Sequence, residues 1–314
     1  MSYFLGSIVF KALIALSYII NWTPRFIKYF IEFFLGRLWF YVFRFRQRII
    51  LINLSLVIHK DTDESIEIYK KRLKNILKEN LKHMISIAFD AIEALSWSRA
   101  DFKKKIIHSG EEYVEDYYNN KKGCFLMTAH MGNWEIANIV GCYLGFPLSS
   151  IARDARGKVS KVVLQKFRDY FDYEHLTEKN SAFKIIKAVK KGRVIGFMMD
   201  QFTFPPHAVD SEFLGIKTFS PKGMALLSLK LKAPVLPVLF LKKKDQFIVR
   251  ILPALDFDDI LEKNMSEEQK ITAHVNKCNQ VLGEFILEDP VQYNWMHKRF
   301  KTTIDYGDYQ LPWE

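Results

Sequence analysis

A histidine and a glutamate, His130 and Glu135, lie five positions apart in a segment whose composition changes abruptly between them. The apolar run that ends at Ala129 predicts a buried strand, and Asn133 is suited to cap a helix that starts near Trp134. On one continuous helix the two side chains would point about 140° apart. A bend from strand to helix can instead bring them together, so that Glu135 orients His130 as a general base for a hydroxyl group.

The surrounding elements predict an α/β fold with a mixed, largely parallel central sheet flanked by helices. From about residue 106 onward, short apolar runs alternate with helical patterns. Ligands collect at the carboxyl ends of parallel strands, and Asp200 and Gln201 follow a predicted strand as His130 does, so the three could face one cleft. The predicted strands are 124–129, 148–152, 194–199, 235–241 and 246–252, and the predicted helices are 63–98 (one or two), 134–144, 158–172, 181–191, 221–231 and 266–287.

Net charge indicates the class of partner, and the cysteines and histidines bear on metals and cofactors. The chain of 314 residues carries a formal net charge of +11, which suggests nucleic acid, an anionic membrane or an acidic carrier protein as a partner. Nucleic-acid-binding modules concentrate such charge in recognisable motifs, and because the sequence contains none we expect no nucleic-acid partner. The three cysteines are isolated and the histidines show no ligand pairing, so we expect no metal and no other cofactor.

The N-terminal region favours a membrane among those partners. Tyr3 to Ile20 is almost continuously apolar, and 26–48 mixes aromatic with basic residues, a composition typical of helices in the headgroup zone. An ordinary buried helical hairpin is the alternative, and the sequence does not decide whether 3–20 crosses the bilayer or lies along it. We predict a membrane anchor with basic interfacial helices over 1–60. The second predicted unit is 61–314, with a helical lead-in over 61–105 and an α/β core over 106–314.

These residues resemble a known family. His130 and Glu135 fit the HX4(D/E) signature of glycerolipid acyltransferases, and the local form Ala129–Glu135 is similar to the late acyltransferases of lipid A biosynthesis, the lauroyl and myristoyl transferases of the lysophospholipid acyltransferase superfamily. Further motifs match this family in order and spacing across nearly the whole chain. They are Asn53-Leu54, Ala152-Arg153-Asp154, Met199-Asp200-Gln201, Phe213-Leu214-Gly215 with Thr218, Val235-Leu236-Pro237, and the closing segment Pro290–Lys301.

The resemblance implies a reaction, its partners and a location. A fatty acyl group would pass from an acyl-carrier-protein thioester to a hydroxyl of a lipid A precursor, an anionic glycolipid, with His130 as general base and Glu135 as its orienting partner. The fold would be glycerolipid acyltransferase-like, and the enzyme would act at the cytoplasmic face of the bacterial inner membrane. Two rivals stay open: another glycolipid, phospholipid or amino-lipid acceptor, and a membrane scaffold without catalysis.

Other residues are candidates for substrate binding, and for most of them a structural or solvent-exposed role is the alternative. Arg153 and Arg156 could grip phosphate or carboxylate groups with their guanidinium forks, or Arg156 could simply be solvated. Asp200 and Gln201 could bind the acceptor or satisfy a strand end. The remaining candidates are Asn133 in the turn, His297, Arg299 and Lys301 for the headgroup, and Phe202, Phe204, Phe213 and Phe219 for an acyl groove or for core packing. The basic runs 103–105 and 242–244 are expected to be solvated, although one of them could dock the carrier protein.

Overall fold

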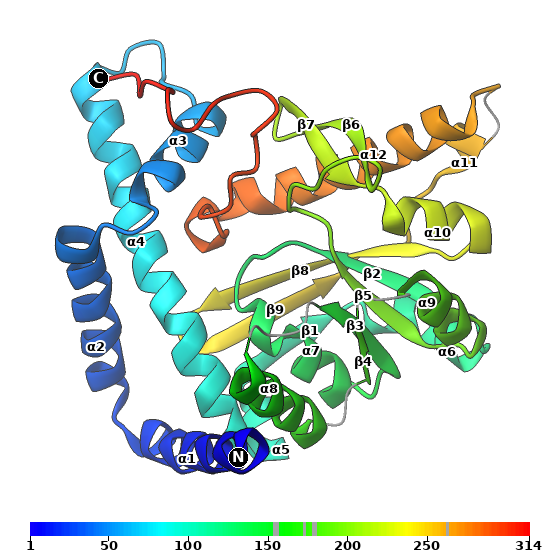
Figure 1. Cartoon of the computed structure of the whole chain (residues 1–314), viewed down its shortest axis with the longest axis horizontal. Helices are drawn as coiled ribbons and strands as arrows, with labels where there is room; N and C mark the ends of the chain where they lie inside the picture. The colour runs from blue at the N-terminus through cyan, green and yellow to red at the C-terminus, as the bar shows by residue number, and fades with distance from the viewer. Residues whose placement is uncertain (153–156, 172–173, 178–180, 262–263) are drawn as a thin grey trace.

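The computed structural model describes the chain except residues 153–156, 172–173, 178–180 and 262–263. Its centre is a seven-stranded sheet in the order β1-β9-β8-β2-β5-β3-β4 (Figure 1). The run from β8 to β4 is parallel, whereas β9 is antiparallel to β8 and β1 follows β9 in parallel. This confirms the predicted mixed, largely parallel sheet. The strands are β1 Ile106–Ser109, β2 Cys124–Thr128, β3 Leu148–Ala152, β4 Glu174–Thr177, β5 Val194–Met198, β8 Val235–Lys243 and β9 Gln246–Ile251, with a separate antiparallel hairpin of β6 Ala208–Phe213 and β7 Ile216–Pro221.

Helices cover both faces of the sheet because β2 is apolar on both sides. Phe125 and Met127 pack into one core with α9, α10 and α12, whereas Cys124 and Leu126 pack into another with α5, α6 and α7. Burial of both faces is the usual arrangement of parallel strands. The helices from the lead-in onward are α4 Ile66–Glu93, α5 Arg99–Lys105, α6 Glu111–Asn119, α7 Trp134–Tyr143, α8 Lys158–Tyr170, α9 Ser181–Lys190, α10 Gly223–Leu231, α11 Asp258–Leu261 and α12 Glu267–Glu288, with short 3-10 turns at Ala94–Ser96 and Pro290–Gln292.

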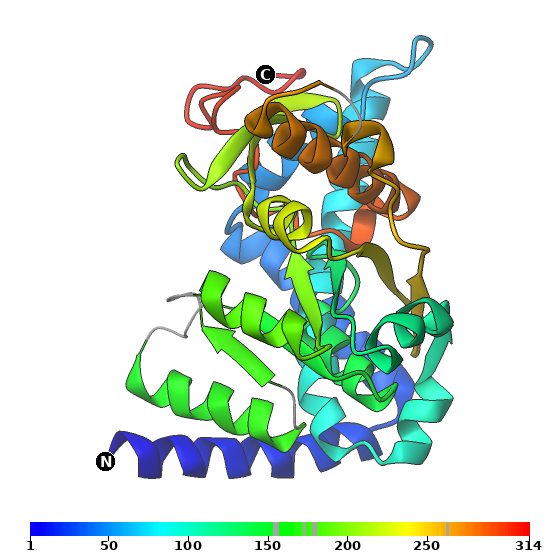
Figure 2. The ribbon, with the colours of Figure 1, turned by 90° about the vertical axis from the view of Figure 1, so that its right-hand side faces the viewer.

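The N-terminal helices line one side of the molecule. α1 (Ser2–Trp22) is long and apolar enough to cross a membrane, although 22% of its most apolar window is buried against the protein. It lies alongside α8 (Figure 2) and also contacts α4. α2 (Arg25–Leu38) packs on α4, ends in a π-helical turn at Trp39–Phe43, and presents outward aromatic side chains that include Phe26 at 73% and Phe30 at 65% exposure. These helices leave an apolar, aromatic face without protein cover among the described residues.

The third N-terminal helix belongs to the folded core. α3 (Gln47–Val57) fully buries Ile50, Ile52 and Leu54. Ile52 packs with Tyr306 and Leu311 from the end of the chain. The predicted anchor region 1–60 therefore contains, at its end, a helix that is packed like the rest of the core.

Lys242 corrects the expectation that the basic run 242–244 is solvated. Its side chain is 11% exposed, and its Nζ lies 2.7 Å from Asp90 of α4 and 3.9 Å from Glu32 of α2. Burial alone would lower the pKa of Lys242, but the two carboxylates outweigh that effect and raise it above its ordinary value. Lys243 and Lys244 are exposed, as expected. Lys243, the last residue of β8, points away from Lys242 because successive side chains of a strand project to opposite faces, and Lys244 lies in the turn beyond the strand.

Removal of the Lys242 charge is expected to destabilise the protein. Lys242→Met would leave Asp90 and Glu32 buried without a cation, which costs about 3–5 kcal/mol in the free energy of unfolding. Urea unfolding measures the change, with Lys243→Met on the exposed neighbour as a control near zero. Equal, small effects of the two substitutions would contradict a structural role for this buried ion pair.

Candidate active site

The register of two neighbouring strands brings His130 and Asp200 together. β2 and β5 run parallel, with Thr128 opposite Met198, and Met199 N–H donates to the carbonyl of Thr128 at 3.1 Å. His130 is two residues beyond the end of β2, and Asp200 is two residues beyond the end of β5. Equivalent positions at the carboxyl ends of adjacent parallel strands project to the same side of the sheet. The predicted proximity of His130, Asp200 and Gln201 is therefore present.

His130 and Asp200 form a hydrogen-bonded pair. The Nδ1 of His130 lies 2.8 Å from Oδ1 of Asp200, whose side chain is 1% exposed, whereas that of His130 is 20% exposed. A carboxylate can only accept, so Nδ1–H donates and the neutral ring keeps its lone pair on Nε2. The fixed tautomer and the partly exposed ring suit a general base.

The electrostatics of the pair favour its charged form. Burial alone would lower the pKa of His130, but Asp200, with a smaller contribution from Glu135, raises it above the ordinary value. Burial alone would likewise raise the pKa of the Asp200 carboxyl, but His130 lowers it below its usual range. Asp200 therefore remains a carboxylate and can stabilise a protonated His130 ring.

Gln201 lies where a reacting group would approach. Its amide nitrogen is 3.3 Å from Nε2 and 3.4 Å from Nδ1 of His130. An amide N–H can donate to the Nε2 lone pair, and an acceptor hydroxyl would have to take over that position. Gln201 is thus placed to contact a substrate at the base.

Glu135 does not form the predicted hydrogen bond with His130. It is exposed in the first turn of α7, and its Oε1 accepts from the indole N–H of Trp134 at 3.0 Å. The Trp134 ring meets the His130 ring edge-on, with centroids 5.6 Å apart. Asp200, on the neighbouring strand end, occupies the position beside Nδ1 of His130, and the start of α7 directs Glu135 to the surface. Glu135 acts on His130 through its charge and through Trp134.

The turn between His130 and α7 is held by backbone contacts that require a glycine. Gly132 has φ of +60°, and an added Cβ would lie 2.2 Å from the carbonyl oxygen of Phe240. His83 of α4 hydrogen-bonds to the Gly132 carbonyl at 3.0 Å, and burial lowers the pKa of His83 to about 4, so this ring is neutral and donates. The turn therefore has little freedom to move away from Asp200.

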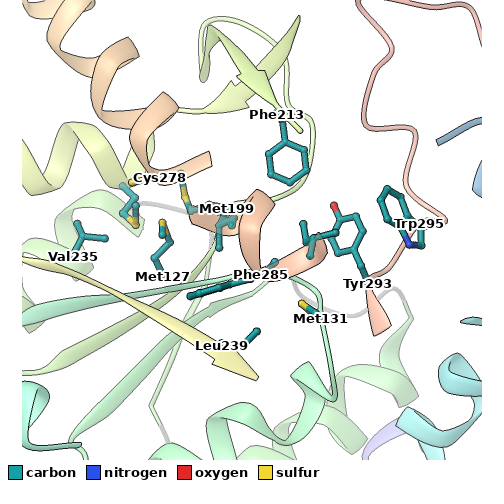
Figure 3. Packing of buried hydrophobic residues seen from close by; sticks show 14 of the residues in the cluster. Met127, Met131, Met199, Phe213, Val235, Leu239, Cys278, Phe285, Tyr293 and Trp295 are labelled. Atoms are coloured by element: carbon teal, nitrogen blue, oxygen red, sulfur yellow. The ribbon is translucent and has the colours of Figure 1, made fainter. Parts of the chain in front are cut away.

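The closing segment pairs with the same turn. Met131 and Tyr293 form an antiparallel bridge, and Asn294 N–H donates to the carbonyl of His130 at 2.9 Å. Tyr293 and Trp295 meet edge-on at 4.8 Å beside Met131 (Figure 3). The segment is fixed by two buried side-chain amides, Asn80 of α4 and Asn53 of α3. Asn80 donates to the carbonyls of Val291 and Tyr293, and Asn53 donates to those of Trp295 and His297.

Arg299 and Asn133 are predicted to contact the substrate, but in the structure both are bound to buried groups of the protein itself. The Arg299 side chain is 2% exposed and donates to Thr218, Ser220 and the carbonyl of Phe219, so it holds β7. Asn133 precedes α7 at the predicted cap position, but its amide donates to Asp90 and to the Ile87 carbonyl, both on α4. Both side chains are directed inward by buried polar partners. They therefore support the site without facing a substrate in this conformation.

His297 is half-buried near the pair, whereas two predicted arginines lie outside the described residues. Burial lowers the pKa of His297 to about 4, so it is a neutral ring, and its Nδ1 has no hydrogen-bond partner within the described part of the chain. Arg153 and Arg156 fall in the stretch that the structure does not describe. No three His, Cys, Asp or Glu side chains among the described residues gather as a metal site would require.

The predicted phenylalanines divide between core and surface. Phe213 is 1% exposed and lies under the Arg299 guanidinium at 4.5 Å, which makes it a packing residue. Phe204 is 60% exposed and meets Phe202 edge-on, with the Lys301 ammonium 4.8 Å from one ring and 5.1 Å from the other. Phe202 is buried at 8% exposure, so Phe204 is the exposed member of this cluster with Lys301, just after Gln201 in the chain. The fold and the site together define an α/β protein whose histidine–carboxylate pair can take a proton from a hydroxyl.

Comparisons with known proteins give the family. A family model described as bacterial lipid A biosynthesis acyltransferase matches residues 3–302. A lipid A biosynthesis acyltransferase of Haemophilus influenzae is 27% identical over 235 residues, which cover 73% of this chain and 71% of the relative. A lipid A biosynthesis palmitoleoyltransferase of Escherichia coli is 22% identical over 260 residues, which cover 82% and 79%. The chain belongs to the bacterial lipid A biosynthesis acyltransferase family and is an acyltransferase, which confirms the resemblance seen in its motifs.

A solved structure is also similar. The 1-acyl-sn-glycerophosphate (LPA) acyltransferase PlsC from Thermotoga maritima aligns over 86% of this chain and 100% of its own, with 15% identity and a TM-score of 0.37.

Substitution of Asp200 is expected to change both the rate and its pH dependence. A general base must be unprotonated, so kcat/KM of the wild type falls as pH drops through the raised pKa of His130. Asp200→Asn removes the group that raises this pKa while burial still lowers it, so the acid limb moves to lower pH. The plateau falls roughly 10²–10⁴-fold because the tautomer is no longer enforced. An unchanged plateau, or a limb that moves to higher pH, would contradict the assigned role of Asp200.

Two substitutions at Glu135 separate its charge from its hydrogen bond. Glu135→Gln keeps an oxygen that can accept from the Trp134 indole, whereas Glu135→Ala removes it. We expect kcat to fall at least about tenfold in the alanine variant, because Trp134 no longer holds its place beside His130, and to fall less in the glutamine variant. Far-ultraviolet circular dichroism checks that both variants fold. Equal losses in the two variants would assign the effect to the charge alone.

Proposed function

We propose that this protein transfers a fatty acyl group from an acyl-carrier-protein thioester to a hydroxyl of a lipid A precursor, with His130 as general base and Asp200 as its orienting partner. The single observation that carries the proposal is the 2.8 Å hydrogen bond from Nδ1 of His130 to the buried Asp200 carboxylate. That bond leaves Nε2 as the basic atom on the partly exposed side of the ring. Membership of the family supports lipid A as the acceptor class.

The reaction needs one proton acceptor that later becomes a proton donor. Nε2 of His130 takes the proton of the acceptor hydroxyl as its oxygen attacks the thioester carbonyl carbon. The tetrahedral intermediate collapses, the carbon–sulfur bond breaks, and the imidazolium returns the proton to the departing thiolate. Asp200 stabilises the imidazolium between these steps, and Glu135 adds negative charge nearby.

Substrate contacts follow from what lies around Nε2. The Gln201 amide is close enough to bind the attacking hydroxyl or its neighbour. His297 is neutral, so we assign it a hydrogen bond to an uncharged or oxyanionic group of the substrate instead of an ion pair. Arg153 and Arg156 remain predicted phosphate contacts of the anionic acceptor.

The partners and location rest on the N-terminal helices and on charge. α1 and the aromatic face of α2 would lie in or on the membrane, with the basic residues at the headgroups. An acidic carrier protein is attracted by the net charge of +11. We place the enzyme at the cytoplasmic face of the bacterial inner membrane, where an acyl carrier protein and a newly made glycolipid can meet.

A product analysis with a matched variant tests the proposal. Wild-type protein, acyl carrier protein with a defined acyl chain, and a lipid A precursor should give a product heavier by one acyl group in mass spectrometry. His130→Ala should lower the rate roughly 10²–10⁴-fold with melting temperature retained. His207→Ala, at an exposed histidine outside the site, is the control and should keep wild-type rate.

Two outcomes would overturn parts of the proposal. Equal rates for wild type and His130→Ala would remove the general base. Acylation of another glycolipid or a phospholipid, with the lipid A precursor left unmodified, would assign a different acceptor to the same catalytic pair.

A further inference from the structure

A basic pocket lies at the bend between α1 and α2, away from His130. Its cavity volume is about 620 Å³, and four separate parts of the chain converge on it: the α1–α2 bend, the end of α4, α5, and the turn between β8 and β9. Thr23 and Pro24 form the bend, and Arg25 begins α2. The site therefore exists only when the apolar helix α1 is docked on the folded domain.

The charges in this pocket are not balanced. Five cations line it, Arg25, Lys28, Lys104, Lys105 and Lys244, against three carboxylates, Glu93, Asp101 and Asp245. Each carboxylate already has a partner. Glu93 binds Lys28 at 2.9 Å and Lys105 at 3.1 Å, Asp245 binds Arg25 at 2.8 Å, and Asp101 closes a capping box with Ser98. Lys104 and Lys244 are exposed, and neither has a carboxylate within 4 Å in the described part of the chain, although Lys104 is close enough to Asp101 to help lower the pKa of that carboxyl.

The mouth of the pocket is flanked by residues suited to a membrane surface. Trp22 ends α1 with 87% of its surface exposed, and Phe26 in the first turn of α2 is 73% exposed. Aromatic side chains of this kind concentrate at headgroup level. If α1 ends at headgroup level, Lys104 and Lys244 of the same pocket would lie near the lipid phosphates.

We propose that this pocket binds the phosphate-bearing headgroup of an anionic membrane lipid, which seats α1 and α2 on the bilayer. A phosphate offers several oxygens to several cations at once, and lysine is well suited to it as a point charge. This inference rests on the membrane association in the proposed function and adds a defined lipid site to it. The alternative source of the same chemistry is free inorganic phosphate.

Vesicle binding by the full-length protein tests the site. Binding is measured on phosphatidylcholine vesicles and on vesicles that also contain phosphatidylglycerol, without any acyl donor. Wild-type protein should bind the anionic vesicles more tightly. The double variant Lys104→Gln/Lys244→Gln should lose about 25-fold of that preference, from about fivefold per lysine, and should bind neutral vesicles as wild type does.

A matched pair of lysines controls for overall charge. Lys121 and Lys122 are exposed outside the pocket lining, and Lys121 shares the left-handed backbone of Lys244, with φ of 54° against 56°. Lys121→Gln/Lys122→Gln should keep most of the preference for anionic vesicles. Equal losses in the two double variants would show diffuse attraction by net charge and overturn the pocket.

Competition distinguishes the two phosphate sources. Inorganic phosphate should displace the protein from anionic vesicles no better than chloride at equal ionic strength, and stronger displacement would reassign the pocket to free phosphate. The assay contains no acyl donor, so the vesicle-binding result does not depend on whether His130 acts as a general base. Wild-type protein that binds neither kind of vesicle would instead overturn both the pocket and the membrane part of the proposed function.

Discussion

The site depends on one constraint, the parallel register of β2 and β5. Thr128 lies opposite Met198, so the residues two positions further on, His130 and Asp200, leave the sheet side by side. Side chains alternate along a strand, so a slip of one residue would turn one member of the pair to the opposite face. The placement of His130 beside Asp200 is thus set by strand pairing in the core.

Buried polar side chains of α4 hold the turn after His130 and the segments packed against it. α4 contributes His83 to the carbonyl of Gly132, Asn80 to the closing segment, and Asp90 to both Asn133 and Lys242. Burial of each of these polar groups would cost free energy if it had no partner, and its hydrogen bond offsets that cost. One helix thereby ties the catalytic turn to the closing segment, to β8 and, through Lys242 and Glu32, to α2.

The fold class could be predicted from the sequence, but the hydrogen-bond partner of His130 could not. The strands at 148–152 and the helix that starts at Trp134 were predicted closely, because apolar runs and a Gly-Asn turn are local signals. The hydrogen bond between His130 and Asp200 depends on strand order, which spacing along the chain cannot express, so spacing alone favours the nearer Glu135. The equal offsets of His130 and Asp200 from their strands were the available signal. The burial of Lys242 and Arg299 and the β6–β7 hairpin also depend on partners distant in the sequence, so spacing along the chain does not predict them.

The most direct measurement is a titration of the His130 imidazole by nuclear magnetic resonance in the ¹⁵N-histidine-labelled enzyme, with the signal assigned by its loss in His130→Gln. The account predicts that the neutral ring carries its proton on Nδ1 and that its pKa lies above the ordinary histidine value of 6.5. A neutral ring protonated on Nε2, or a pKa below that value, would show that Asp200 does not hold the base and would contradict the mechanism.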